Sequence, residues 1–284
     1  MDLVKHVEIH KKVGVKIISN KWIDKDVQSI LRPLNVMQTL LFCPKYCIED
    51  NFIKRNSLLT NVLSLFWASF IVCSYLYRFM NIQRNISTFN DVKTVYIIPH
   101  FDIYFYCIGF ISNSVLNIVQ SKLQSRFVIY YQKVHRIIND ENKFKITMIV
   151  NWIIVINIFV MYIIIMIGNR YYLNISVDFM ITMFVLITFD ANIIYAIRCL
   201  QLLIIKIDQW NKKCLKCQDL TREKLKLYCD NMFQAYANIL KCYNILKITF
   251  KHLVSFTLHF FVFVMFLFLN LLHYNKYKYF GMSN

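Results

Sequence analysis

A nearly continuous apolar stretch, Asp178 to Ile205, constrains this chain more than any other feature. As an α-helix its 28 residues would extend roughly 42 Å, whereas the hydrocarbon core of a bilayer is about 30 Å thick. The stretch ends at Lys206, and Lys212, Lys213 and Lys216 follow it. Lysines that flank an apolar helix favour the cytosolic side of a membrane. The sequence therefore predicts a membrane-spanning helix whose C-terminal end faces the cytosol.

Four further apolar stretches are long enough to cross a bilayer. The five predicted spans cover residues 58–79, 95–119, 146–167, 178–205 and 252–273. The composition agrees, because 57% of the residues are hydrophobic and the chain has only four glycines and three prolines. We predict an all-α fold, a polytopic bundle of membrane helices. Residues 58–284 form this transmembrane domain, and residues 1–57 form a cytoplasmic N-terminal region.

The segments between the spans are shorter or more polar. Ile30 to Phe42 has thirteen residues, too few to span, and we expect it to lie at the interface or against the bundle, with Pro33 in its first turn. Residues 81–93 and 168–177 are predicted to be short outer loops, and residues 120–145 a basic inner loop, helical where the spans extend. Residues 206–247 are predicted to form an amphipathic helix. Its apolar stripe is Leu225, Tyr228, Met232, Phe233, Tyr236, Ile239, Leu240 and Tyr243.

Charge and glycosylation motifs both bear on orientation. Residues 1–57, 120–145 and 206–251 hold 26 Lys and Arg residues, and the segments on the other side hold six. Positive charge gathers on the cytosolic side, so the N-terminus is predicted to be cytosolic and the end that follows the fifth span to be outside. The chain has two N-glycosylation motifs, which begin at Asn85 and Asn174. Both fall in loops that this orientation places outside.

The sequence also argues against several classes of protein. A net charge of +17 is compatible with nucleic-acid binding, but the basic residues lie between apolar spans rather than on one soluble face, and anionic membrane lipids are the expected partners. The chain has no catalytic or phosphate-binding motif, so we expect no enzyme activity, catalytic residue or cofactor. The Cys214–Cys217 pair is interpreted as reduced thiols, and no disulfide framework or metal site is expected.

Three segments resemble the insect gustatory receptor family of chemoreceptors. Leu31 to Asn51 is similar to the segment before the family's first span, and Leu225 to Phe250 to its long amphipathic helix. The fourth span, which continues through residues 198–200 into residues 208–211, resembles the family's helix and basic loop. The resemblance covers nearly the whole chain and implies an inverted seven-helix topology. It implies a plasma-membrane chemoreceptor, a subunit of a homo- or hetero-tetrameric ligand-gated cation channel that detects small tastants such as sugars or bitter compounds.

The chain departs from the family in one respect. The family's seventh helix carries a Thr-Tyr … Gln-Phe pattern and lines the pore, whereas this sequence ends after the fifth predicted span. We therefore expect this chain by itself to lack the pore helix. An odorant receptor has the same topology and is the nearest alternative. A multi-pass transporter or another membrane protein is a further alternative, although the sequence shows no internal repeat of the kind that transporters often carry.

Polar groups within spans are costly and are candidates for a binding site. The resemblance implies a ligand pocket in the outer half of the bundle. By position, the candidate ligand-binding residues are Tyr96, His100, Asp102, Tyr104, Tyr162, Met183 and Asp190. The structural alternative is that Asp190 is paired with Arg198, His100 or an Asn, and that His100 and Asp102 lie at the wet interface. His252 and His259 share a helix face, but two histidines alone do not predict a metal site.

Overall fold

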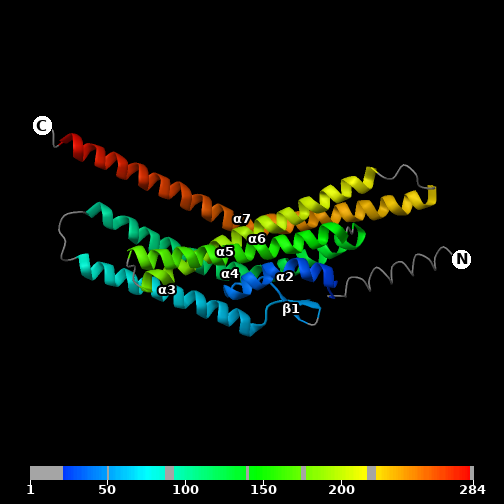
Figure 1. Ribbon diagram of the computed structural model, residues 1–284, viewed down its shortest axis with the longest axis horizontal. Coiled ribbons are helices and arrows are strands. Elements are labelled where there is room, and N and C mark those ends of the chain that lie inside the picture. Colours follow the sequence, from blue (N-terminus) through cyan, green and yellow to red (C-terminus); the bar gives the residue numbers. More distant parts are fainter. Residues whose placement is uncertain are drawn as a thin grey trace.

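The structure is a computed structural model that describes residues 22–49, 51–86, 93–138, 141–173, 177–215 and 222–281. These residues form six helices and one two-stranded hairpin, so the predicted all-α fold is confirmed and the hairpin is an addition to it. Most of the helices run along the long axis of the molecule (Figure 1). In chain order, the elements are α2 (Lys25–Leu40), β1 (Cys47–Glu49), β2 (Phe52–Lys54), α3 (Leu58–Ile86), α4 (Lys93–Ile137), α5 (Glu141–Leu173), α6 (Val177–Leu215) and α7 (Arg222–Gly281).

The helices are longer than the predicted spans. α4 has 45 residues and α7 has 60, so each continues well past the apolar stretch that predicted it. The expected loop at residues 81–93 is wrong at both ends, because α3 extends to Ile86 and α4 begins at Lys93. In the same way, α5 continues through Gly168 to Leu173. Residues 81–86 and 168–173 contain no proline, so nothing in these two segments stops α3 and α5 at the predicted membrane boundary.

Three helices in the described part are long and apolar enough to cross a membrane. They are Leu58–Tyr77 of α3, Phe144–Tyr172 of α5 and Ile187–Leu215 of α6. Most of the exposed side chains of α5 are apolar, among them Ile153, Ile156 and Ile164. Water-soluble proteins rarely expose contiguous apolar faces of this size, which supports a membrane protein.

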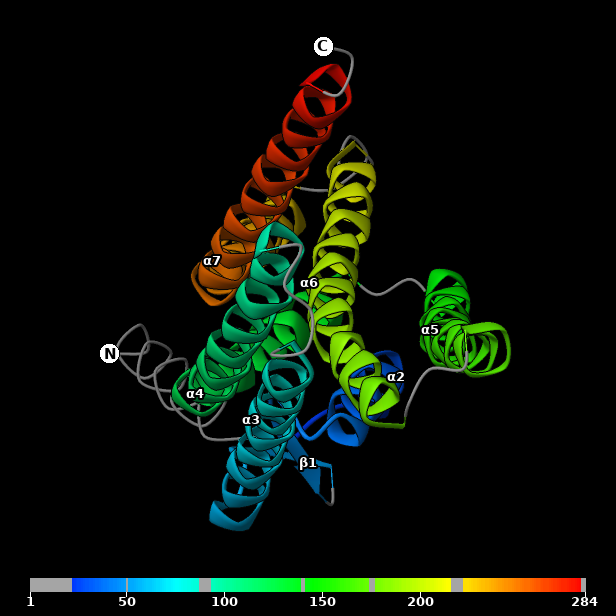
Figure 2. The same cartoon turned by 90° about the vertical axis from the view of Figure 1, so that its left-hand side faces the viewer.

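α6 is the central helix of the bundle. Within its apolar window 56% of the residues are buried, against 11% for α5. The buried face of α6 repeats every three or four residues and comprises Ile187, Ala191, Tyr195, Cys199 and Leu202. Such spacing keeps one stripe of a helix turned toward its neighbours. Figure 2 shows α5 set apart from α3 and α4, with α6 between them.

α2 packs against the bundle, which is one of the two positions that the sequence predicted for the segment from Ile30 to Phe42. Its buried side chains recur at helical spacing and include Val27, Ile30, Leu31 and Leu34, and the helix packs on α5 and α6. The expectation that Pro33 lies in the first turn of this helix is wrong, because the helix begins at Lys25, eight residues before Pro33. The buried face continues through Pro33, and its burial outweighs the one backbone hydrogen bond that a proline removes.

The buried face of α7 differs from the predicted stripe. The residues turned toward α4 and α6 include Met232, Ala235, Ile239, Cys242 and Leu246. The exposed ones are Phe233, Tyr236, Leu240 and Tyr243, with Phe233 73% exposed. Met232 and Ile239 belong to the predicted stripe and are buried as expected, whereas Phe233, Tyr236, Leu240 and Tyr243 of that stripe are exposed. Small side chains such as Ala235 and Cys242 let helices approach closely, so the buried face includes them in place of the larger side chains of the stripe.

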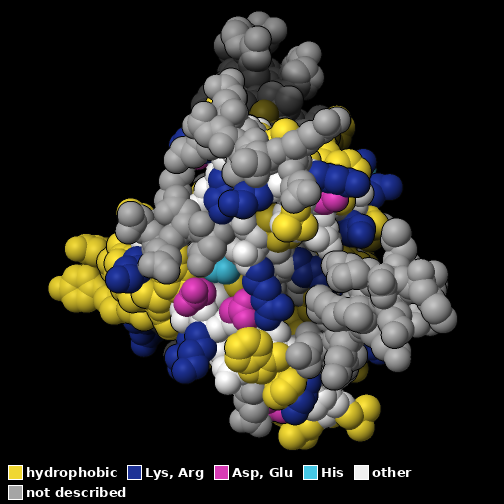
Figure 3. All heavy atoms as spheres, turned by 90° about the vertical axis from the view of Figure 1, so that its right-hand side faces the viewer, with side chains coloured by type: hydrophobic (Ala, Val, Ile, Leu, Met, Phe, Trp, Pro, Cys, Tyr) yellow, Lys and Arg dark blue, Asp and Glu magenta, His cyan; other side chains and the backbone are white. Residues whose placement is uncertain are grey.

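Basic residues gather at one end of the molecule, where α4 ends and α5 begins (Figure 3). Two lysines of α6 complete the end of α4: Lys206 donates to the carbonyl of Ile138 and Lys213 to that of Ile137, both at 3.2 Å. Arg136 donates two hydrogen bonds, of 2.7 and 2.9 Å, to the Asp24 carboxylate. Cations near the last carbonyls of a helix satisfy groups that have no partner within the helix.

Candidate functional site

Two of the predicted ligand-binding residues are in contact. The Tyr162 hydroxyl of α5 donates a hydrogen bond to Oδ2 of Asp190 on α6. Asp190 is exposed, and Tyr162 is half-buried against the core. A carboxylate within an apolar stretch is costly unless it has partners or water, and such groups commonly mark binding sites or ion pathways. The Tyr162–Asp190 pair is therefore the centre of the candidate site.

The remaining predicted residues are placed only by their backbone. Tyr96, His100, Asp102 and Tyr104 lie on α4 and Met183 lies on α6, but their side chains are outside the described part of the structure. The glycosylation candidate Asn85 lies in the last turn of α3, also without a described side chain, and Asn174 lies outside the described residues. Of the seven predicted ligand-binding residues, Tyr162 and Asp190 are therefore the two whose side-chain positions the structure describes.

Arg198 is not the partner of Asp190 among the described contacts. Its Nε donates to Oδ1 of Asn151 at 2.8 Å, and its guanidinium also donates to Gln201. Asn151 in turn donates to the carbonyl of Ile30 in α2 at 2.8 Å. Asp190 and Arg198 are eight residues apart in the sequence. Over eight residues an α-helix makes two full turns plus about 80° and rises roughly 12 Å, so the two side chains are well separated. Arg198 instead connects α6 to α5 and α2.

Aromatic rings line α3, α4 and α6 beside the pair. Phe189, which precedes Asp190, lies edge-on to Phe110 with centroids 4.7 Å apart, and 6.1 Å from Tyr106. Tyr106 stacks on Tyr75 at 5.9 Å. Sequence reasoning did not select these rings for the site, because their grouping depends on how three helices pack. The aromatic spacing within each helix was the one signal available.

A layer of buried polar side chains crosses the centre of the bundle. Gln38 of α2 donates to the carbonyl of Ala191 at 3.2 Å, and Asn192 donates to Asn113 of α4 at 3.3 Å. Several buried atoms in this layer have no partner within the described residues, including Oδ1 of Asn192 and Nδ2 of Asn117. Burial of an unpaired polar atom costs about 1–3 kcal/mol, and a ligand that pairs with such atoms would offset this cost. This layer is therefore a second candidate binding site.

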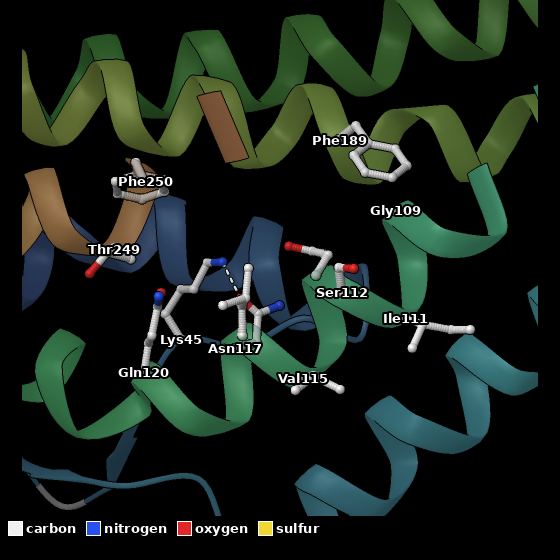
Figure 4. A pocket seen from close by; sticks show the side chains of 12 residues that line it. Lys45, Gly109, Ile111, Ser112, Val115, Asn117, Gln120, Phe189, Thr249 and Phe250 are labelled. Atoms are coloured by element: carbon white, nitrogen blue, oxygen red, sulfur yellow. Dashed lines mark hydrogen bonds between the residues drawn. The ribbon is translucent and has the colours of Figure 1, made fainter. Parts of the chain in front are cut away.

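A cavity of about 430 Å³ adjoins this layer (Figure 4). One side is formed by α4, and Lys45, Phe189, Thr249 and Phe250 complete its lining. Lys45 enters from the segment between α2 and β1 and donates a hydrogen bond to Oδ1 of Asn117. This volume is within the usual range for small-molecule sites, about 300–1,000 Å³. Sequence analysis did not select Lys45, because it lies outside every predicted span.

No protein-family model, curated protein or solved structure matches this chain. Within the described residues, no three His, Cys, Asp or Glu side chains are grouped so that they could hold a metal ion. The functional argument therefore depends on the arrangement of the helices and on the contacts described above.

Proposed function

We propose that this chain is a chemoreceptor of the insect gustatory type, a plasma-membrane protein with five spans in this sequence and a cytosolic N-terminus. It acts as a subunit of a tetrameric, ligand-gated cation channel, with copies of itself or with related subunits. The observation that carries the proposal is the Tyr162–Asp190 contact. It places a polar pair, from two neighbouring helices, in a region that is otherwise apolar.

The chemistry of the pair suits a small hydroxyl-bearing tastant. Tyr162 donates to one oxygen of Asp190, which leaves the other oxygen to accept a hydrogen bond from a ligand. Phe189 and Tyr106 supply apolar ring surface nearby. Binding sites for small molecules combine mostly apolar walls with a few polar groups that fix orientation. Sugars and hydroxylated bitter compounds present both kinds of surface.

The helix arrangement offers a route from the site to the channel. Asp190 lies on the central helix α6, which packs against α7, and α7 also packs along α4. A ligand that binds more tightly to one arrangement of α5 and α6 shifts the population toward that arrangement. In the proposed receptor, this shift favours the open channel.

The test is tastant-evoked cation entry. The chain is expressed in cells that carry a fluorescent cation indicator, alone and together with full-length gustatory receptors, and its surface delivery is measured by biotinylation. We expect a panel of sugars and bitter compounds to evoke a response that the partner receptors alone do not give. Surface-delivered chain that adds no response with any partner would contradict the receptor proposal.

A further inference from the structure

The cavity beside Lys45 is a separate place from the Tyr162–Asp190 pair. Neither Tyr162 nor Asp190 lines it. Its lining includes Lys45, Asn113, Asn117, Gln120 and Thr249 as polar members, contributed by α4, α7 and the segment before β1. Figure 4 shows Lys45 extending between Gln120 and Asn117, with Thr249 across from them.

Lys45 is the feature of the cavity that most needs explanation. Lys45 is only 4% exposed, and among the described lining residues it is the one cation and none is a carboxylate. Its described hydrogen bond is to the neutral amide of Asn117. A buried ammonium without an anion is costly, because burial removes its hydration and an amide oxygen only partly replaces it. The described lining residues therefore give the ammonium no negative charge to pair with.

Two further donors belong to side chains that line the same cavity. Nδ2 of Asn117 and Oγ1 of Thr249 are buried and have no hydrogen-bond partner within the described residues. Asn117 is 7% exposed and Thr249 is 6% exposed, so water reaches neither freely. A carboxylate or phosphate oxygen accepts hydrogen bonds from ammonium, amide and hydroxyl groups alike. The polar side of the cavity therefore matches an anionic head group.

Apart from Gly109 and Ser112, the rest of the described lining is apolar. Its walls are Ile111, Val115, Leu116, Phe189 and Phe250. The volume of about 430 Å³ is far larger than a carboxylate needs, so the ligand that fills it also carries an apolar chain.

We propose that this cavity binds an amphipathic anion, a fatty-acid carboxylate or the phosphate of an anionic lipid, with its head group on Lys45 and Asn117 and its chain along the apolar walls. The two sources share one chemistry and are separated by the experiment. The proposal does not depend on the receptor function, because binding is measured directly.

The experiment measures binding of radiolabelled decanoate to the purified full chain in nanodiscs of phosphatidylcholine, with empty nanodiscs as background. We expect saturable binding that neutral decanol and cationic decyltrimethylammonium do not compete away. Octanoate should bind roughly 15-fold more weakly than decanoate, because each methylene contributes about fourfold. Phosphatidylglycerol is then added to the nanodiscs. If it competes with decanoate, the bound anion is an anionic lipid; if it does not compete, the bound anion is a free fatty acid.

Two variants and one control locate the site. Lys45→Gln removes the charge and should weaken decanoate binding at least tenfold. Val115→Trp narrows the cavity from a half-exposed wall position, leaves Lys45 in place and should also weaken binding. Lys206→Gln is the matched control, since Lys206 is equally buried, at 4% exposure, but does not line the cavity. Folding of each variant is checked by elution volume and helical circular dichroism.

The outcomes are distinct. Loss of binding in folded Lys45→Gln, or in Val115→Trp if Lys45→Gln does not fold, with binding retained in Lys206→Gln, supports the proposal. Equal binding of decanoate and decanol, or unchanged decanoate binding in the folded variants, overturns it. Either result leaves the tastant response at Tyr162 and Asp190 as a separate question.

Discussion

At the scale of single residues, we expect the side chains of Asp190 and Tyr162 to act together in binding a ligand. Asp190→Asn keeps the shape of the side chain but removes its charge, and Tyr162→Phe removes the hydroxyl that donates to it. If a ligand uses the oriented carboxylate, each variant should raise the half-maximal tastant concentration about tenfold or more, and the double variant little further. The measurement is a dose–response curve for cation entry, with surface expression measured in parallel.

A matched control for Asp190 exists on the same helix. Asp208 forms a 2.9 Å ion pair with Lys212 near the C-terminal end of α6, and both side chains are about half exposed. Asp208→Asn should leave the tastant response unchanged, because exposed ion pairs contribute little. If Asp190→Asn instead prevents surface delivery while Asp208→Asn does not, Asp190 has a structural role.

Lys45 predicts a pH dependence for anion binding. Burial lowers the pKa of Lys45 to about 8, and the titratable groups near its ammonium are the thiols of Cys43 and Cys199. Burial also raises the pKa of Cys43 to about 11, so that thiol is neutral near pH 8. An anion prefers the charged ammonium, which the empty site holds below about pH 8 and loses above it. Decanoate affinity should therefore be constant from pH 6.5 to 7.5 and fall up to tenfold between pH 8 and 9. A flat profile to pH 9 would contradict this prediction.

At the scale of elements, α2 is held in place mainly by its buried face. Leu34 is fully buried, whereas Leu40 on the same helix is 58% exposed. Leu34→Ala should destabilise the fold by about 2–5 kcal/mol, because it leaves a cavity where α2 meets the bundle. Leu40→Ala removes the same atoms from an exposed position and should have little effect. The measurement is the apparent Tm in detergent, and equal Tm shifts for the two variants would mean that α2 does not dock in this way.

The contact between the start of α2 and the end of α4 predicts acid sensitivity. His135 is buried, and neither of its ring nitrogens has a described hydrogen bond. Its pKa is lowered to about 4, mainly by burial and secondly by the positive charge of Lys206, while the charges of Asp26 and Asp24 act in the opposite direction. Because the unfolded His, with a pKa near 6.5, binds a proton that the folded one excludes, stability falls as pH drops from 6.5 to 4. Asp24, whose pKa is lowered by Arg136, adds to the loss at the acidic end. The apparent Tm should drop between pH 7 and 5, and less so in His135→Gln.

The positions of the helices could be predicted from the sequence, but the faces that they turn toward one another could not. Hydropathy alone located the helices of the described spans, because a long apolar run has one stable backbone conformation in lipid. It identified the inward face of α7 only in part, because Met232 and Ile239 are buried as predicted but Ala235 and Cys242 pack in place of Phe233. Facing depends on the neighbouring helices, and so does the Lys45 cavity, to which four separate segments contribute. Tyr162 and Asp190 were predicted because a polar group in an apolar run is visible without any neighbour.

At the scale of the whole molecule, the number of spans decides which side each connection faces. Three helices are long and apolar enough within the described residues, and we propose that α4 and α7 also cross. With five spans and a cytosolic N-terminus, the connection between α4 and α5 is cytosolic. If α3, α5 and α6 alone crossed, α4 would remain outside and the same connection would be outside as well. An N-terminal and a C-terminal tag lie on opposite sides in both cases and do not distinguish them.

Glycosylation of the α4–α5 connection distinguishes the two arrangements. Glu141→Thr completes an acceptor motif that begins at Asn139, and glycosylation acts only on the luminal side during synthesis. We expect no mass shift on glycosidase treatment at this position, because 26 Lys and Arg residues in the three segments assigned inside favour a cytosolic connection. Asn85→Gln and Asn174→Gln in the same background separate any glycan on the two loops predicted to be outside from one on Asn139. A glycan on Asn139 would place α4 outside the membrane, and the polar groups of α4 from His100 to Gln120 would then face water instead of a site between spans.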